Sequence, residues 1–384
     1  MQTPGRVGKT PQEQSSGRQA STPSRTNVVG NRATQVWAVV LMASVVVGCG
    51  TSTSPGAPNG ASQRSVGSPA ASQTGPPTAS LKAAEGDTWI VFQALFNGDA
   101  DLGLVRPDGS ASQRIPGGPG NRWHPDWSPD GTQLAYDWIL PTDVAEIAIL
   151  NLDGSGERSL LECVEPCLGN GGPAWSPDGR TIGFDGAEGP TDAYPNGVCY
   201  IALLDLGSGD ATRILEFPEC LSNDPADDLA AGIYMRFSPD GERIVFQGLG
   251  PQGTAIFTAA IDGQNVRQLT AWGLGARPDW SPDGEWIVFQ SLDTEEHGDE
   301  PISIHRIRPD GRDLEQLTAP YGTTIDLYPR WLVDGSEILF SRCPYREAPD
   351  CEARVVSPDG GGEARLLLPF AQAAVHLIWQ PAER

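Results

Sequence analysis

The chain has 384 residues, with 49 acidic against 26 basic side chains and a formal net charge of −23. This balance argues against nucleic-acid binding, which requires clustered Lys and Arg to neutralise phosphates. Seven cysteines and an apolar segment near the start indicate a chain that is exported from the cytoplasm.

Residues 1–48 are predicted to be a lipoprotein signal peptide. Five basic residues and one acidic residue accompany a twelve-residue apolar run, Val36 to Val47, which is short for a membrane span. The run ends in Val46-Val47-Gly48-Cys49, which resembles a bacterial lipobox and makes Cys49 the expected lipid attachment residue. We therefore expect a lipid-anchored, extracytoplasmic protein of the cell membrane or outer membrane. A plain signal peptide, or a short anchor with an incidental cysteine, is the alternative.

Residues 49–86 are rich in Ser, Thr, Pro, Gly and Ala and contain almost no large apolar side chain. Such a segment cannot bury enough surface to offset its ordering entropy. It is predicted to be a flexible tether, and a glycosylated stalk fits the same composition. Without residues 1–48, the chain has 21 basic and 48 acidic residues, a formal balance of −27.

A five-residue turn motif, Trp-Ser-Pro-Asp-Gly, recurs through the rest of the chain at intervals of 43 to 62 residues. It is intact at Trp127, Trp175 and Trp280, reads Phe-Ser-Pro-Asp-Gly from Phe237 and Trp-Leu-Val-Asp-Gly from Trp331, and is truncated at Trp379. Pro presets φ for the first turn position, Asp can bond its own backbone, and Gly accepts positive φ. Repeats of this length are typical of stacked or radial architectures.

Each copy is followed by the same short apolar strand, which ends nine residues after the motif's first aromatic residue. The strand-end aromatics are Tyr136, Phe184, Phe246, Phe289 and Phe340. A second Gly-containing turn, such as Asp262-Gly263, then predicts a hairpin. Four antiparallel strands in each repeat, arranged radially, describe an all-β propeller.

Counting the strands predicts six blades. Residues 88–92 match a second strand without a first, and Val375 to Pro381 match a first strand without a second. Together they complete one blade, so that strands from the two chain ends close the ring over residues 87–381 and leave no exposed sheet edge.

The repeats resemble those of TolB-type propellers. The resemblance is carried by the segments from Leu269-Thr270 to Pro278-Asp279-Trp280-Ser281-Pro282-Asp283-Gly284 and from Leu317-Thr318 to Pro329-Arg330-Trp331. It implies the fold but not a function, because propellers carry out many unrelated roles. TolB has an additional α/β domain before its propeller, whereas this chain has the low-complexity tract there, so a role in the Tol system does not carry over.

Six cysteines follow Cys49, an even number that suggests disulfides in an exported chain. Cys343 and Cys351 flank one connection between strands, and Cys163 and Cys167 share a loop between blades. Cys199 and Cys220 then remain to pair within the third blade. Zinc binding is the rival interpretation, but no second Cys or His motif lies near these residues.

The long connections between second and third strands, and between blades, are expected on one face of the ring, opposite the tight turns. They include residues 161–173, 186–198, 217–233 and 292–302. Long loops on a rigid scaffold are where binding usually occurs. A polar residue follows each second-strand aromatic near this face: Gln93, Asp137, Asp185, Gln247, Gln290 and Ser341. They are candidates for a polar channel lining that binds a ligand, or for strand-end side chains that are satisfied within the structure.

No catalytic motif, cofactor fingerprint or metal-ligand spacing is recognisable. His124 is expected to be structural, and the acidic run around His297 lacks the fixed spacing of a calcium loop. We expect a non-enzymatic, membrane-tethered module that binds an extracytoplasmic protein, peptide or glycan. The alternatives are an extracytoplasmic enzyme that acts on carbohydrate or peptide through acidic residues of the long-loop face, and a purely structural envelope module.

Overall fold

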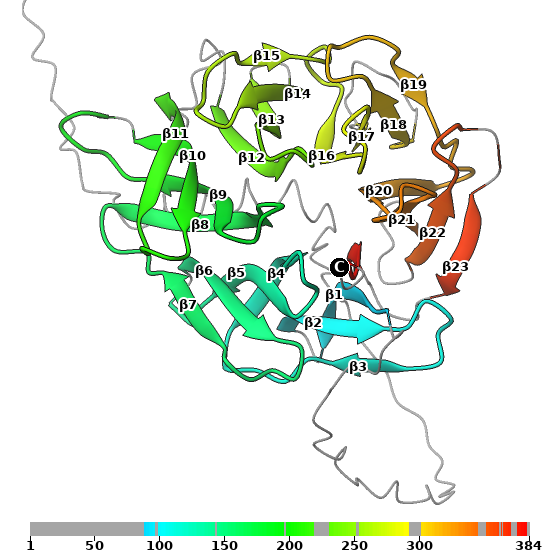
Figure 1. The fold of residues 1–384 in the computed structure, drawn as a ribbon, viewed down its shortest axis with the longest axis horizontal. Coiled ribbons are helices and arrows are strands. Elements are labelled where there is room, and N and C mark those ends of the chain that lie inside the picture. The colour runs from blue at the N-terminus through cyan, green and yellow to red at the C-terminus, as the bar shows by residue number, and fades with distance from the viewer. Residues whose placement is uncertain are drawn as a thin grey trace, which may run out of the picture. The chain divides into compact units, whose positions relative to one another are not determined.

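Six four-stranded antiparallel sheets form a ring (Figure 1) in the computed structural model. The structure describes residues 88–381 except 97–98, 143, 196, 219–229, 251–252, 292–300, 345–350, 361, 363 and 370–374. The signal peptide, the lipobox and the tether lie outside these residues and remain predictions. Within the described residues, no helix is long and apolar enough to cross a membrane.

Each sheet is one blade, and its strands follow one another from the channel outward. Blade 1 contains β24 (Val375–Trp379), β1 (Ile90–Phe96), β2 (Asp99–Val105) and β3 (Ser112–Arg114). Blade 2 contains β4 (Asn121–Trp127), β5 (Gln133–Ile139), β6 (Ala145–Asn151) and β7 (Arg158–Leu161). Blade 3 contains β8 (Cys167–Trp175), β9 (Thr181–Glu188), β10 (Val198–Asp205) and β11 (Ala211–Pro218).

The other three blades repeat this order. Blade 4 contains β12 (Ala230–Phe237), β13 (Arg243–Gly250), β14 (Gly253–Ala260) and β15 (Arg267–Gln268). Blade 5 contains β16 (Ala276–Trp280), β17 (Ile287–Gln290), β18 (Ile304–Ile307) and β19 (Glu315–Gln316). Blade 6 contains β20 (Thr324–Trp331), β21 (Ile338–Pro344), β22 (Glu352–Val356) and β23 (Arg365–Pro369). The first strands β4, β8, β12, β16, β20 and β24 contact one another around the channel.

The repeated motif forms the turn that its residue types predict. In blade 2 the Gly131 N–H donates to the Ser128 carbonyl over 2.8 Å, and Gly131 has a φ of 69°. The Ser128 hydroxyl donates to Asp130 Oδ1 over 2.6 Å, and this bond lowers the pKa of Asp130 against the opposing effect of its desolvation. The turn is therefore stabilised by contacts within its own five residues, which explains why the Ser-Pro-Asp-Gly part recurs in four of the repeats.

The two ends of the ring close as predicted. In blade 1 strand β24 pairs with β1, and Trp379 lies opposite Ile90. Gln380 adds a clamp, since its N–H donates to the Trp89 carbonyl over 2.8 Å and its Oε1 accepts from the Trp89 N–H over 3.0 Å. Its Nε2 donates to the Gly131 carbonyl over 2.8 Å, so one side chain connects the closing strand to the turn of blade 2.

The hydrophobic core lies between the blades. The strand-end aromatics Tyr136, Phe184, Phe246, Phe289 and Phe340 are all 0–1% exposed. Trp127 packs with Val91 and Leu102 of blade 1 and with Leu134 of its own blade, which gives the motif tryptophan its role in blade packing.

Disulfides join Cys163 to Cys167 and Cys343 to Cys351. Cys199 is also disulfide-bonded, but Cys220 lies outside the described residues, so their pairing stays a prediction. Two expected loops are shorter than the sequence predicts. Strands β8 and β9 continue to a pairing of Cys167 with Glu188, which turns parts of residues 161–173 and 186–198 into sheet.

Candidate functional site at the channel

Four of the six predicted polar residues are buried and hydrogen-bonded to the next blade. Gln93 Oε1 accepts from the backbone N–H of His124 over 3.2 Å, and Asp137 Oδ1 accepts from that of Gly172 over 2.8 Å. The same bond joins Gln247 to Arg277 over 3.1 Å and Gln290 to Tyr328 over 2.8 Å. These side chains therefore support the neighbouring inner strand, and nothing in this geometry tests whether they also touch a ligand.

The residues that receive this support have an unusual backbone. His124, Tyr234, Arg277 and Tyr328 have φ values of 49°, 62°, 55° and 58°, in the left-handed region that side chains other than glycine rarely adopt. The pairing register of each inner strand shifts at the same point, which marks a β-bulge. The acceptor on the preceding blade holds the N–H of the strained residue and so stabilises the bulge.

Asp185 accepts the same kind of bond from the next blade but is only partly buried, and Ser341 completes the predicted set. The Tyr234 N–H hydrogen-bonds to the Asp185 carboxyl, whereas Asp185 Oδ1 is buried without a partner among the described residues. Burial, and then the negative charge of Asp137, raise the pKa of Asp185 well above its usual value. The Ser341 hydroxyl is buried and has no hydrogen-bond partner within the described part of the chain.

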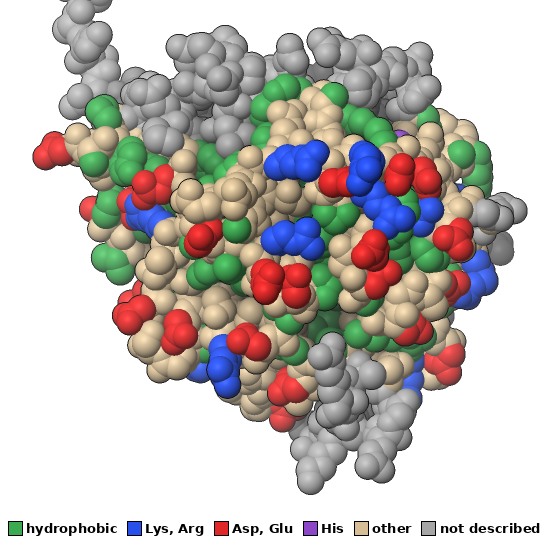
Figure 2. Space-filling view, turned by 45° about the horizontal axis from the view of Figure 1, so that its top comes forward, with side chains coloured by type: hydrophobic (Ala, Val, Ile, Leu, Met, Phe, Trp, Pro, Cys, Tyr) green, Lys and Arg blue, Asp and Glu red, His purple; other side chains and the backbone are tan. Residues whose placement is uncertain are grey.

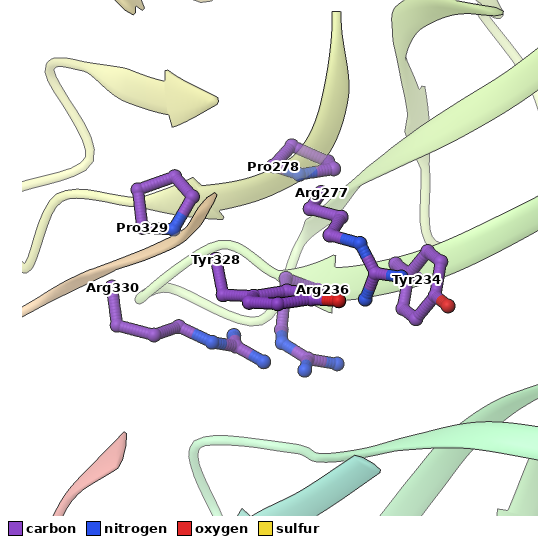
Figure 3. Close-up of a pocket in the computed structure, with 7 residues that line it drawn as sticks. All are labelled: Tyr234, Arg236, Arg277, Pro278, Tyr328, Pro329 and Arg330. Carbon is purple, nitrogen blue, oxygen red and sulfur yellow. The ribbon is translucent and has the colours of Figure 1, made fainter. Parts of the chain in front are cut away.

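The side chains at the bulges gather at one channel pocket. Tyr234, Arg236, Arg277, Tyr328 and Arg330 line it together with Pro278 and Pro329, from strands β12, β16 and β20. The Arg277 guanidinium lies between two aromatic rings, 4.0 Å from the ring centre of Tyr234 and 4.2 Å from that of Tyr328 (Figure 3). By strand direction these residues lie toward the face that carries the inter-blade connections.

The pocket continues into a polar network on the side of blades 2 and 3. His124 Nδ1 lies 2.5 Å from Asp137 Oδ2, and its Nε2 lies 3.1 Å from the Tyr234 hydroxyl. At the equivalent position of blade 3 stands Gly172, whose Cα has no side chain and faces Asp185 Oδ1, so that a Cβ there would come within 2.5 Å of that oxygen. The channel is therefore lined by side chains from blades 2, 4, 5 and 6 and by backbone in blade 3.

Buried carboxylates face these arginines. Asp279 Oδ2 accepts from the Trp331 N–H over 2.9 Å, and its Oδ1 lies 3.4 Å from Arg330 Nη1. Burial raises the pKa of Asp279 to about 7, and it also raises the pKa of Asp126. The positive charge of Arg236 lowers the pKa of both carboxyls, but by less than burial raises it.

Sequence reasoning missed the five pocket residues Tyr234, Arg236, Arg277, Tyr328 and Arg330. A signal was present in His124-Pro125, Arg277-Pro278 and Tyr328-Pro329, because a proline inside a strand is typical of an edge strand or a β-bulge. The acidic run around His297 lies outside the described residues. Among the described ones, no group of three or more His, Cys, Asp or Glu side chains could hold a metal ion.

Charge on the described surface is mixed. In the face that Figure 2 shows, acidic and basic side chains are interspersed among polar and apolar ones. The predicted absence of nucleic-acid binding was drawn from composition and stays a prediction.

No protein-family model matches the chain. An uncharacterised protein of Agrobacterium fabrum, Atu1656, is 28% identical over 103 residues, which cover 25% of this chain and 35% of that protein. Among solved structures, TolB from Acinetobacter baumannii matches with a TM-score of 0.57 at 19% identity, over 76% of this chain and 66% of that one. A putative TolB from Agrobacterium tumefaciens matches with 0.52 at 20% identity, over 76% and 91%.

Other propellers are similar to a comparable degree. An oligogalacturonate lyase in complex with manganese matches with a TM-score of 0.51 at 18% identity, over 73% of this chain and 74% of that one. The fold and these likenesses define a TolB-like six-bladed β-propeller. At 20% identity or less they show the fold alone, and the chain spans about a third of its Agrobacterium fabrum relative and just under two thirds of the Acinetobacter protein.

Proposed function

We propose that this protein is a membrane-tethered, extracytoplasmic binding module that receives a segment of a protein partner at the channel mouth. The observation that carries the proposal is the stack of Tyr234, Arg277 and Tyr328, which three consecutive inner strands place side by side. Tyr and Arg are the residue types that dominate binding energy in interfaces, because they combine large contact area with hydrogen bonding. The β-bulges fix their backbone, so little ordering entropy is lost on binding.

A solved propeller structure that contains a protein complex supports the proposed binding role, although it does not identify a partner for this chain. A nidogen/laminin complex matches the fold with a TM-score of 0.55 at 10% identity.

The lipobox at Cys49 and the following tether would hold the channel near the membrane surface. If so, Cys49→Ser should move the protein from the membrane fraction to the soluble fraction, whereas an unchanged distribution would contradict lipid anchoring.

The binding role can be tested with a peptide library displayed on phage and selected against the full-length chain. Selected peptides are then titrated against Tyr234→Ala, Tyr328→Ala and the control Val333→Ala, an exposed residue in the tight turn that follows β20. We expect each tyrosine variant to lose about tenfold or more in affinity, as hot-spot truncations do. Equal affinity for all three variants would place binding elsewhere.

An enzyme remains the second candidate. His124 and Asp137 form a hydrogen-bonded pair 2.5 Å apart beside Asp185, an arrangement capable of proton transfer. The oligogalacturonate lyase likeness suggests an acidic oligosaccharide as the first substrate to assay. Release of shortened oligogalacturonate that is lost in Asp137→Asn would favour the enzyme over the binding module.

A further inference from the structure

We propose that Arg236, Arg277 and Arg330 form a carboxylate-binding pocket, which accepts one acidic side chain or the terminal carboxylate of a peptide. This inference rests on the proposed function and names the chemistry of the ligand. It concerns a single oxyanion group that enters the channel between blades 4, 5 and 6. Figure 3 shows the guanidinium groups of Arg236 and Arg330 on the same side of the Tyr328 ring, with the side chain of Arg330 directed toward Arg236.

Arg236 has hydrogen-bonding capacity that its surroundings leave unused. Its side chain is nearly buried, at 7% exposure, and its Nη1 donates to the carbonyls of Met235 over 2.8 Å and Pro173 over 3.3 Å. Its Nε is buried and has no hydrogen-bond partner among the described residues. A guanidinium offers five donors, and an unsatisfied buried donor is costly, so an incoming acceptor here restores hydrogen bonding that folding removed.

Arg277 adds a second positive charge to the pocket, and two aromatic rings restrain it. The centre of its guanidinium lies 4.0 Å from the ring centre of Tyr234 and 4.2 Å from that of Tyr328, and the residue is 6% exposed. Cation–π contacts of this kind restrain the side chain and hold its charge beside Arg236 and Arg330. Arg330 adds a third charge, and its 3.4 Å contact with Asp279 is long for a charge-assisted hydrogen bond.

The charges around the pocket favour an anionic group. Three carboxyls face Arg236, from Asp126 on β4, Asp185 on β9 and Asp279 on β16, and burial raises the pKa of each. Asp279, whose pKa is about 7, is partly protonated near neutral pH, and this leaves the positive charge of the arginines incompletely balanced. The cavity has a volume of about 10 Å³, which is about one water molecule. It therefore has room for about one oxygen atom of a bound ligand.

The test uses the full-length chain and a matched pair of peptides, Gly-Ser-Glu-Glu-Ser-Gly and its Gln-Gln counterpart, both amidated at the C-terminus. We expect the Glu peptide to bind at least tenfold more tightly by isothermal titration calorimetry. Arg236→Gln and Arg330→Gln should remove this preference. Arg312→Gln, which deletes the same charge at a 79% exposed position, should retain it.

The pH dependence of the wild-type protein keeps the test decisive even if an arginine variant fails to fold. Lowering the pH from 8 to 6 protonates Asp279 while the peptide carboxylates stay ionised, so affinity for the Glu peptide should rise and that for the Gln peptide should not. Equal binding of both peptides would overturn the carboxylate assignment but leave a binding role at the channel intact. Binding of galacturonate alone, or of none of these probes, would overturn the assignment of an acidic peptide.

Discussion

Gln380 provides a direct test of how the ring is closed. Its side chain is 8% exposed and joins the Trp89 N–H of blade 1 to the Gly131 carbonyl of blade 2 through two hydrogen bonds of 3.0 and 2.8 Å. Both backbone groups belong to buried residues. Gln380→Met fills a similar volume but makes neither bond. A buried group that loses its partner costs about 1–3 kcal/mol, so the two together predict a loss of about 2–6 kcal/mol in the free energy of unfolding.

The assay is urea denaturation followed by tryptophan fluorescence, since Trp89 and Trp379 lie at the closure. Gln133→Met is the matched control, because Gln133 donates a single bond to Asn151 within blade 2 and is only partly buried. The control should lose less than about 1 kcal/mol. If Gln380→Met is no more destabilising than the control, the side chain does not contribute to closure, and the β24–β1 pairing together with packing accounts for it alone.

Further outcomes follow from the same structure. Asp279 has a pKa of about 7 in the folded state, against an ordinary value of 3.8. Because the folded state then binds the proton more tightly than the unfolded state, folding stability should fall as pH rises from about 4 to about 7. Asp279→Asn should therefore gain stability relative to wild type between pH 5 and pH 8, measured by urea titration. A parallel pH dependence of the two proteins would contradict this. Cys343 and Cys351 are eight residues apart, and replacing both with Ser should lower the free energy of unfolding by about 2.5 kcal/mol, because the unfolded chain gains loop entropy. Reduction of the wild-type protein should likewise lower its denaturation midpoint. Gly209 and Gly263 both have a φ of 79°, but a Cβ at Gly263 would overlap a backbone oxygen, whereas Gly209 has open space around it. In thermal melting, Gly209→Ala should lose roughly 1–2 kcal/mol of stability through backbone strain, and Gly263→Ala should lose clearly more. Equal losses of stability would show that the backbone next to Gly263 shifts to accommodate the Cβ.

The fold was predictable because its determinants are local and repeated. The turn at Ser128 to Gly131 is held by bonds within its own residues, so its sequence predicts its shape wherever it recurs. The pairing of Trp379 with Ile90 was predictable for a related reason, since the two ends carry complementary parts of one repeat.

The site was only partly predictable, because its determinants are contacts between blades. The sequence places Gln247 and Gln290 at the ends of second strands, but their partners Arg277 and Tyr328 lie 30 and 38 residues further along. Nothing in a single repeat shows that these backbone N–H groups will point at the preceding blade. The left-handed conformation of Arg277, and with it the direction of its side chain, therefore follows from tertiary hydrogen bonds that periodicity does not report.

The β-bulges separate what a position must do for folding from what it can do for recognition. At His124, Tyr234, Arg277 and Tyr328 the main chain is anchored by its neighbour, while the identity of the side chain differs from blade to blade. Substitution of the side chains at these equivalent positions can therefore change which ligand the channel binds, while the ring itself stays the same. Engineered specificity in this protein would begin at those positions.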